Sequence, residues 1–395
     1  MRMFKYVIVG GGMTGDAAAK GIREVDSEGT IAMFTVENHR PYDRPPLTKG
    51  LWKGDDANAI WHEPTQDVDL MLGRRIERID REARQVQDDR GETYGFEKLL
   101  LATGVSPRHL KFGEGVVYFR TYDDYEKLKD EATPGRRIAV IGGGFIGSEL
   151  SASLVGQGCH VTLIFPSSGI GTNIFPPGLS ENLVDYYREK GVDVKVGSEV
   201  HDVRREGSGY RIRVQDGSGN QADEKVDLVV AGVGTVPNVS LAKNSGLTVE
   251  YGVEVDEFLA TSDPNIYAAG DVANFYDPAT EKRRRVEHED NANSMGKAAG
   301  RNMAGVQEKF HHQPFFYSDL FDLGYEAVGE VDSRLEFFED WKDPFREGVV
   351  YYLRDGRVRG VLLWKVWDQV DAARELIAAK ELVNPENLRG RLPKK

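Results

Sequence analysis

Short apolar, β-branched runs that end in glycine turns recur along this chain, and a helical pattern follows the first of them. Residues 6–9 form that run, and Gly10, Gly12 and Gly15 form its turn. With this spacing the first glycine permits a tight turn, the second lets a pyrophosphate approach the backbone, and the third lets the helix pack on the strand. The phosphates then lie at the helix N-terminus. Glu37 ends the next apolar run, about 20 residues further on, where a carboxylate holds the adenosine ribose in such units. The pattern predicts a dinucleotide-binding unit.

The same pattern returns at residues 138–141, followed by Gly142, Gly144 and Gly147 and by a second helical segment. Two Rossmann-like units imply two dinucleotides. The next apolar run ends near Ser167, where neither the ribose-binding acid nor an arginine stands. The choice between NAD and NADP at this second unit is therefore poorly encoded.

Three further apolar runs also end in small residues, one before the second unit, within 98–104, and two after it begins, within 228–234 and 264–271. In the last of them Gly270 permits close backbone approach, and Asp271 can accept hydrogen bonds from a polyol such as a ribitol chain. We therefore expect the first nucleotide fold to be interrupted by the second and completed near Gly270.

The last part of the chain has a different pattern. Short β patterns cover residues 347–353 and 359–364, and Asp355-Gly356 between them is a hairpin signal. A helical pattern over 369–380 follows. These features predict an antiparallel sheet with a helix.

Composition narrows the function classes. The chain has 395 residues and a net charge of -13, which disfavours nucleic acid and anionic membranes as partners. No apolar run approaches the roughly 18 residues of a membrane helix, and no signal-peptide core is apparent, so we expect a cytoplasmic protein without an integral membrane segment. Cys159 is the single cysteine, which forbids an intrachain disulfide.

Taken together, these motifs resemble the FAD-dependent pyridine nucleotide:disulfide oxidoreductase superfamily, in its branch of apoptosis-inducing factor and the ferredoxin reductases. The segments that carry the finer resemblance are 40–52, 165–176, 283–288 and 316–329. The resemblance implies an α/β fold with two Rossmann-like domains, the NAD domain inserted in the FAD domain, and a C-terminal α+β domain with an antiparallel sheet. The expected domains are FAD-binding (1–115 and 250–305), NAD(P)H-binding (116–249) and C-terminal (306–395).

The resemblance also implies the site residues. Lys49 and Glu149 would pair near flavin N5 as the catalytic residues, since an ammonium there stabilises the reduced ring; the alternative is two solvated charges. The expected FAD-binding residues are Gly10, Gly12, Gly15, Glu37, Arg44, Pro45, Lys49, Ile76, Ala102, Thr103, Gly104, Arg108, Gly270, Asp271, Glu287, His288, Phe316 and Tyr317. The expected NAD(P)H-binding residues are Gly142, Gly144, Phe145, Ile146, Gly147, Glu149, Ser167 and Gly234.

Some of these residues have plainer alternatives. Phe145 resembles the aromatic that covers the nicotinamide side of the flavin, but it could equally be a core residue under the helix, and His288 could be a helix-start residue. The triplet 283–285 and the tail 394–395 are basic clusters best explained as a solvated hairpin and a frayed terminus. His311-His312 has no second pair at metal spacing, so we expect no metal.

The chain departs from the superfamily in lacking the cysteine pair beside the flavin, so dithiol chemistry is excluded and Cys159 is expected to be a packing residue. The implied function is a FAD-dependent NAD(P)H:acceptor oxidoreductase that favours NADH modestly and passes electrons to a quinone, a ferredoxin or another small acceptor. The first alternative is a ferredoxin or rubredoxin reductase component. The alternative of another class is an NADH-sensing flavoprotein with a long-lived reduced complex and changed association, and the resemblance allows a homodimer.

Overall fold

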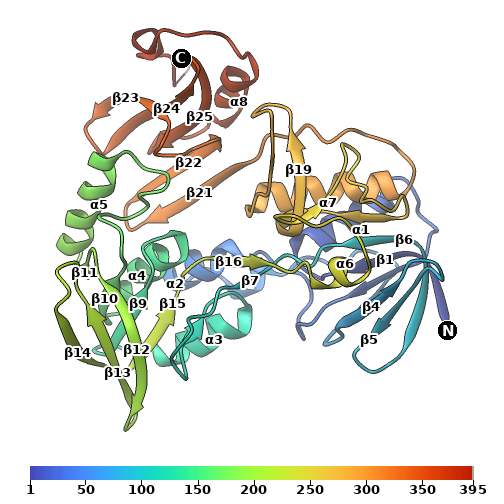
Figure 1. Cartoon of the computed structure of the whole chain (residues 1–395), viewed down its shortest axis with the longest axis horizontal. Helices are drawn as coiled ribbons and strands as arrows, with labels where there is room; N and C mark the ends of the chain where they lie inside the picture. The colour runs from blue at the N-terminus through green and yellow to red at the C-terminus, as the bar shows by residue number, and fades with distance from the viewer. Residues whose placement is uncertain (394–395) are drawn as a thin grey trace. The chain divides into compact units, whose positions relative to one another are not determined.

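The computed structural model describes residues 1–393 and divides into two compact units (Figure 1). Unit 1 comprises residues 1–44, 57–106 and 236–315, and unit 2 comprises residues 45–56, 107–235 and the chain from 316 onward. Lys394 and Lys395, expected to be a frayed basic tail, lie outside the described residues.

Unit 1 is built on a sheet in the order β3-β2-β1-β6-β5-β4, with β18 paired to β6. Strands β1, β2, β3, β6 and β18 run parallel, while β4 and β5 form an antiparallel extension. Val7 and Ile8 of the central strand β1 are fully buried, as expected for β-branched residues covered on both faces of a parallel sheet. The strands are β1 (Arg2–Val9), β2 (Ile31–Phe34), β3 (Val68–Met71), β4 (Ile76–Asp80), β5 (Gln85–Asp88), β6 (Thr93–Leu101) and β18 (Ile266–Ala268).

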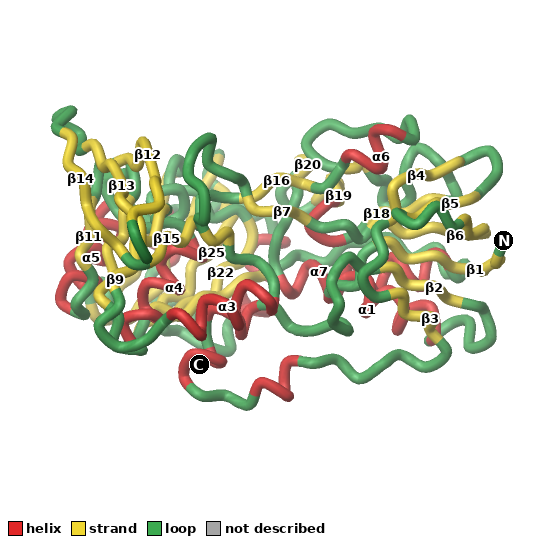
Figure 2. The backbone as a smooth tube through the Cα atoms, turned by 90° about the horizontal axis from the view of Figure 1, so that it is seen from below, coloured by secondary structure: helices red, strands yellow, loops and turns green. Residues whose placement is uncertain are grey.

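Two long helices of unit 1, α1 (Met13–Arg23) and α7 (Glu289–Met303), pack against each other (Figures 1 and 2). Glycines bring their backbones together, because a Cβ on Gly300 would lie 2.0 Å from the carbonyl oxygen of Ala18. The remaining elements of unit 1 are α6 (Ser240–Asn244), β17 (Val253–Glu254), β19 (Ala273–Asp277) and β20 (Lys282–Arg284), together with short 3₁₀ turns.

Unit 2 contains a second parallel sheet in the order β11-β10-β9-β15-β8. Its strands are β8 (Val117–Tyr118), β9 (Arg137–Ile141), β10 (His160–Ile164), β11 (Asp193–Lys195) and β15 (Leu228–Ala231). An antiparallel sheet of β12 (Glu199–Glu206), β13 (Gly209–Gln215) and β14 (Gln221–Val226) follows β11 along the chain. The helices are α2 (Gly50–Lys53), α3 (Tyr122–Glu131), α4 (Phe145–Gly156) and α5 (Pro177–Glu189). Short strands β7 (Val105–Pro107) and β16 (Thr235–Pro237) lie where the chain passes between the units.

The C-terminal part of unit 2 is a sheet in the order β21-β22-β25-β24-β23, whose paired strands β22, β25, β24 and β23 run antiparallel. Asp355 and Gly356 form the predicted hairpin turn between β24 and β25, with φ of 52° and 68°. Helix α8 packs against β22 and β25 in the region where a closing helix was predicted. The elements are β21 (Phe315–Leu320), β22 (Leu323–Gly329), β23 (Glu336–Asp343), β24 (Glu347–Arg354), β25 (Arg357–Trp364) and α8 (Val370–Ala378).

The predicted fold class is confirmed. The chain begins one parallel α/β sheet, builds a second, and then returns to add β18 to the first. A separate antiparallel sheet with a helix follows. The boundaries of the two compact units differ from those of the three expected domains. Residues 45–56 belong to unit 2 because α2 packs on α4, and the C-terminal sheet shares that unit with the second Rossmann-like sheet.

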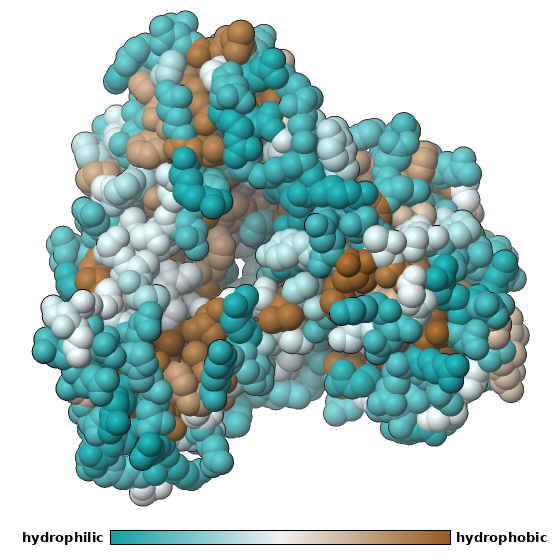
Figure 3. Space-filling view, in the orientation of Figure 1, coloured by the Kyte–Doolittle hydropathy of each residue, from teal (hydrophilic) through white to brown (hydrophobic). Residues whose placement is uncertain are grey.

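Polar side chains cover most of the face drawn in Figure 3, with small apolar groups between them. Within residues 1–393, no helix has the length and apolar character needed to cross a bilayer.

Candidate dinucleotide sites and redox centre

The first glycine turn has the geometry of a phosphate cradle. Gly10 has φ +122°, and a Cβ there would lie 2.1 Å from the carbonyl oxygen of Ala102. A Cβ on Gly15 would lie 2.0 Å from the carbonyl oxygen of Gly10, so both positions must be glycine to let α1 start against the strands. A Cβ on Gly12 would meet only the Arg44 guanidinium, at 3.9 Å. Gly12 therefore leaves open the approach to the α1 N-terminus, where a pyrophosphate fits.

The second glycine turn repeats this arrangement in unit 2. Gly142 has φ +114° and packs on the carbonyl of Gly232, while Gly147 packs on Gly142. A Cβ on Gly144 would meet nothing within 4 Å. Predicted site residue Ile146 lies beside Gly232, where a Cβ would be 3.2 Å from Ile146 Cβ. Each turn thus has two glycines set by close packing and one facing open space, which fits one dinucleotide at each helix.

Glu37, the expected ribose acid, follows β2 and is held by two residues of the next loop. The Tyr42 hydroxyl donates to Oε2 at 2.6 Å, and the Arg44 guanidinium donates to Oε1 at 2.5 Å. The guanidinium also lies over the Tyr42 ring, with its central carbon 5.1 Å from the centroid. These contacts fix the carboxylate beside the first glycine turn.

His62 bridges α1 to the same loop. Its Nδ1 lies 2.7 Å from an Asp16 carboxylate oxygen and its Nε2 lies 2.7 Å from one of Asp43. Lys20 also pairs with Asp16, at 2.7 Å, and the Thr65 hydroxyl donates to it. Hydrogen bonds to Asp16 and Asp43 raise the pKa of His62 to about 9, so the imidazolium holds the loop that presents Arg44.

Five further expected FAD residues follow two strands of unit 1: Ala102, Thr103 and Gly104 follow β6, and Gly270 and Asp271 follow β18. Thr103 is fixed by Asn238, which accepts from its hydroxyl at 2.9 Å and donates to its carbonyl at 2.8 Å. Gly270 has φ +73° and packs on Thr14, and Asp271 is half-buried after it. Ala102 and Gly104 flank Thr103 at the end of β6, whereas Ile76 is a buried core residue of β4.

The segment before α7 is closely paired. Arg285 donates to the Asp271 carbonyl at 2.7 Å and forms an ion pair with Glu287 at 2.6 Å. His288 is the N-cap residue of α7, and burial, with the Arg284 charge, lowers its pKa to about 3. His288 is therefore a neutral imidazole near neutral pH, able to donate one hydrogen bond and accept another. His288 thus stands at the start of the helix, where its side chain makes no capping hydrogen bond, and its expected ring contact stays a proposal.

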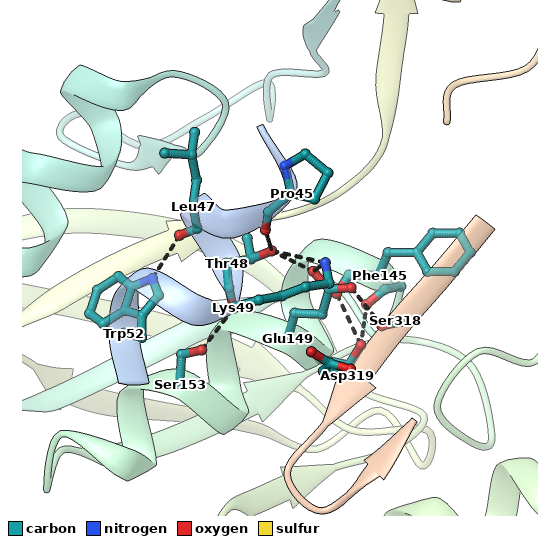
Figure 4. Close-up of polar contacts among 12 residues, drawn as sticks. Pro45, Leu47, Thr48, Lys49, Trp52, Phe145, Glu149, Ser153, Ser318 and Asp319 are labelled. Carbon is teal, nitrogen blue, oxygen red and sulfur yellow. Dashed lines mark hydrogen bonds and ion pairs between the residues drawn. The ribbon is translucent and has the colours of Figure 1, made fainter. Parts of the chain in front are cut away.

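Unit 2 contains a buried ion pair between Lys49 and Glu149 (Figure 4). Lys49 Nζ lies 2.7 Å from Glu149 Oε2, and the two side chains are 10% and 4% exposed. The Thr48 hydroxyl also donates to Oε2, and the Ser318 hydroxyl donates to Oε1 at 2.5 Å. Both carboxylate oxygens are thus occupied, which a buried charge requires. The expectation that Lys49 and Glu149 pair is confirmed, and the alternative of two solvated charges is wrong.

Aromatic side chains flank this pair. Lys49 Nζ lies 5.5 Å from the centroid of the Tyr317 ring. Phe145, the first residue of α4, is 38% exposed and contacts the edge of Phe316 with ring centroids 5.5 Å apart. Phe145 is therefore not the buried core residue of the alternative interpretation.

The loop after β10 carries no ribose acid, as the sequence indicates. The Ser167 hydroxyl is turned to the Gly169 carbonyl, to which it donates at 3.0 Å. Lys195 of the neighbouring strand pairs with Glu224. Gly234 has φ +95°, and its carbonyl accepts from the backbone N–H of Arg108 at 2.8 Å.

Several expectations need correction or placing. The hairpin of β19 and β20 exists, but it is not a solvated basic cluster: Arg284 and Arg285 have side chains only 16% and 4% exposed and are paired with Asp277 and Glu287. Burial raises the pKa of Cys159, a buried thiol that donates to a backbone carbonyl. Among the described residues, no group of three or more His, Cys, Asp or Glu side chains is placed to hold a metal ion.

The expected FAD residues are divided between the units. Pro45, Lys49, Arg108, Phe316 and Tyr317 belong to unit 2, and all the others belong to unit 1. Sequence reasoning missed Tyr42, Thr48, His62 and Ser318. Tyr42 and Thr48 lie inside the segment 40–52 and Ser318 lies inside the segment 316–329, and the resemblance of these segments could have pointed to them. No local signal marks His62.

The chain combines two glycine cradles of this geometry, a ribose acid at the first cradle, and a buried lysine–carboxylate pair. These features define a flavin-type oxidoreductase with two dinucleotides and no catalytic disulfide. A family model described as pyridine nucleotide-disulphide oxidoreductase matches residues 4–296, and one described as apoptosis-inducing factor, mitochondrion-associated, C-term, matches residues 299–341 and 338–379. The chain belongs to the pyridine nucleotide-disulphide oxidoreductase family and is a FAD-dependent NAD(P)H oxidoreductase.

Relatives and solved structures agree with this assignment. The chain is 33% identical to apoptosis-inducing factor 1, mitochondrial, of Dictyostelium discoideum, covering 98% of this chain and 80% of that protein. It is also 33% identical to the ferredoxin–NAD(+) reductase component of the anthranilate 1,2-dioxygenase system of Burkholderia cepacia, covering 97% and 96%. The fold matches putidaredoxin reductase in its covalent complex with putidaredoxin, with a TM-score of 0.90, 28% identity and coverage of 98% and 95%.

Proposed function

We propose that this oxidoreductase takes electrons from NADH and delivers them to a ferredoxin-type protein. The observation that carries the proposal is the buried Lys49–Glu149 pair, in a chain whose single cysteine, Cys159, is free and also buried. A disulfide cannot relay electrons here, so they must leave the flavin directly for an external acceptor. Relatives named as ferredoxin–NAD(+) reductase components, matched over nearly their whole length, support a ferredoxin-type acceptor.

FAD, when bound, supplies the chemistry of accepting a hydride and releasing electrons. In unit 1 the open side of Gly12, Glu37 and Asp271 would hold it, and in unit 2 the open side of Gly144 would hold the nicotinamide dinucleotide. The Lys49 ammonium, fixed by Glu149, would offset negative charge that develops on the reduced cofactor. These roles rest on the geometry within each unit and on the family.

The proposal is tested on the purified protein. Heat should release FAD, one per chain, and stopped-flow mixing with NADH should bleach the flavin faster than mixing with NADPH. Reoxidation by a [2Fe-2S] ferredoxin should be much faster than by a quinone or by dioxygen. Release of FMN, or of no flavin after reconstitution with FAD, would contradict the cofactor assignment, and preference for the quinone would contradict the acceptor.

A second candidate function is sensing of NADH, favoured by the match of the C-terminal residues to the apoptosis-inducing factor model. In that case NADH would give a long-lived reduced complex that turns over poorly with every acceptor and changes its association. Size-exclusion chromatography with and without NADH, run beside the acceptor panel, separates the two functions. A cytoplasmic location and a homodimer remain predictions from the sequence.

A further inference from the structure

The loop between β10 and α5 is attached on two sides, and both attachments lie within unit 2. On one side the Gly171 N–H donates to the carbonyl of Gly143, in the middle of the second glycine turn, at 3.0 Å. The position of this loop therefore bears directly on the turn whose Gly144 faces open space.

On the other side, three consecutive carbonyls of the loop accept hydrogen bonds from the C-terminal sheet region. The Ser333 hydroxyl donates to Thr172 at 2.5 Å, and the Ser333 N–H donates to Asn173 at 3.1 Å. The Tyr352 hydroxyl, on β24, donates to Ile174 at 2.5 Å. Burial raises the pKa of Tyr352 far above its ordinary range, so this hydroxyl keeps its proton and remains a donor.

The next residue of the loop anchors it by packing. Phe175 is 3% exposed, and its ring meets those of Tyr325 and Trp364 edge-on, with centroids 5.3 and 5.5 Å away. Tyr325 and Trp364 stack on each other in the C-terminal sheet and are fully buried. The loop thus has a rigid apolar support beneath it and hydrogen bonds along its backbone.

Gly169 and Gly171 give the backbone of this loop wide conformational freedom in the unbound chain, and Gly171 has φ +68°. Within the loop, the Ile170 carbonyl is held by the Ser180 hydroxyl at 2.7 Å, and residues 172–174 are held by the C-terminal sheet region. Ordering a mobile loop when a ligand binds costs conformational entropy that a loop already fixed does not pay. Tethering of the loop by another part of the fold therefore raises affinity for whatever binds at the adjacent glycine turn.

We propose that Tyr352 and Ser333, from the C-terminal sheet region, are positioning residues for the nicotinamide dinucleotide at the second glycine turn. They act through the backbone of residues 171–174 and touch neither the dinucleotide nor the flavin. The inference rests on the proposed binding of NADH at Gly144. It gives the C-terminal part of the chain a role in cofactor affinity.

The test compares two neighbouring buried tyrosines of β24. Tyr352→Phe removes the donor to the loop, whereas Tyr351→Phe removes a hydroxyl that accepts from the Leu392 N–H and has no contact with the loop. Both substitutions delete one oxygen from a fully buried side chain. Ser333→Ala, and the double variant Ser333→Ala/Tyr352→Phe, complete the set.

Each FAD-loaded protein is assayed for NADH oxidation with ferricyanide as acceptor, and for binding of NAD⁺ by titration calorimetry. We expect Tyr352→Phe to raise the KM for NADH and the Kd for NAD⁺ by about three- to tenfold, with kcat and flavin content unchanged, and the double variant to raise them further. Tyr351→Phe should match the wild type.

An unchanged KM and Kd in Tyr352→Phe and in the double variant would overturn the inference, as would an equal rise in Tyr351→Phe. If Tyr352→Phe loses its flavin or does not fold, Ser333→Ala decides, because its side chain is only half-buried and its loss leaves the packing of Phe175 intact. Failure of the wild type to be reduced by NADH would instead refute the proposed function and the inference with it.

Discussion

Gly12 and Gly144 have nearly the same backbone conformation, with φ and ψ of -88° and -170° at the first and -89° and -167° at the second. Each is the N-cap residue of a helix, and each has room for a Cβ: at Gly12 it would meet only the Arg44 guanidinium, at 3.9 Å, and at Gly144 nothing within 4 Å. An L-residue can adopt these dihedral angles, so neither position is glycine because of the backbone. We therefore propose that the bound dinucleotide, rather than the fold, requires glycine at both positions.

The first prediction follows from this pair. Gly12→Ala should fold with a free energy of unfolding within about 1 kcal/mol of the wild-type apoprotein, since only the helix cap changes, but should lose FAD on desalting. Gly144→Ala should keep its FAD and show a raised KM for NADH. Flavin absorbance and thermal melting check both. Gly10→Ala is the contrast, because its Cβ would collide with the Ala102 carbonyl and destabilise the fold itself. Full flavin retention by Gly12→Ala would contradict the phosphate cradle.

The second prediction concerns the buried ion pair. Glu149→Gln leaves the Lys49 charge buried without its partner and should destabilise the protein by about 3–5 kcal/mol. Lys49→Ala should slow flavin reduction by NADH and lower the flavin potential, because the reduced ring loses a positive charge. Denaturant unfolding, stopped-flow reduction and potentiometry measure these effects.

The double variant Lys49→Met/Glu149→Leu separates the two roles, since replacing a buried pair by apolar residues restores stability without restoring the charge. Lys53→Ala is the control, because Lys53 is 58% exposed and its ion pair with Asp319 spans 3.9 Å at the surface. Normal reduction rate and potential in Lys49→Ala would show that the pair is structural only.

The third prediction concerns cofactor choice. Without an acid near Ser167, the site neither binds the 2′-hydroxyl of NADH strongly nor repels the 2′-phosphate of NADPH. We expect NADH to be preferred about tenfold or less in kcat/KM, which corresponds to about 1.4 kcal/mol. Ser167→Glu should sharpen the preference by repelling the phosphate, and Ser167→Ala, which loses only the hydroxyl bonded to Gly169, should not. A strong preference of the unmodified protein for NADPH would show that a basic group from elsewhere in the fold reaches this loop.

The fourth prediction is a pH dependence that arises from His62. Its pKa is raised from an ordinary value of 6.5 to about 9 in the folded protein. Protonated His62 therefore stabilises the fold in full below pH 6.5, and this stabilisation, on the order of 3 kcal/mol, is lost as the pH rises toward 9 and above. The difference in free energy of unfolding between wild type and His62→Gln should shrink between pH 7 and pH 10. A difference that stays constant with pH would rule out an imidazolium bridge.

The strands and glycine turns could be predicted because their signals are local. A β-branched run that ends in glycine and leads into a helix specifies strand, turn and helix within about 20 residues, and the two fingerprints appear in the structure at those positions. The hairpin at Asp355-Gly356 was predictable for the same reason, since both turn residues need positive φ.

The partners of Glu149 could not be predicted in this way. Thr48 and Ser318 lie 101 and 169 residues from it in sequence, and a hydroxyl gives no pattern that reveals a distant carboxylate. The short interval 45–56 shows a related limit: its motif was visible, but its membership of unit 2 depends on packing of α2 against α4. The solvated basic cluster was misjudged at Arg284 and Arg285 because their partners, Asp277 and Glu287, bury them.

The division of the chain between the units has a consequence for its synthesis. The polypeptide changes unit after Arg44, Asp56, Ser106, Thr235 and Phe315, so neither unit is a continuous stretch. On the ribosome, strand β18 emerges long after its pairing partner β6, and helix α7 emerges long after α1, on which it packs. At about 5–20 residues per second, residue 315 is reached only after roughly 15–60 s. Until then the nascent chain carries an unfinished parallel sheet, and we expect unit 1 to be completed only late in synthesis.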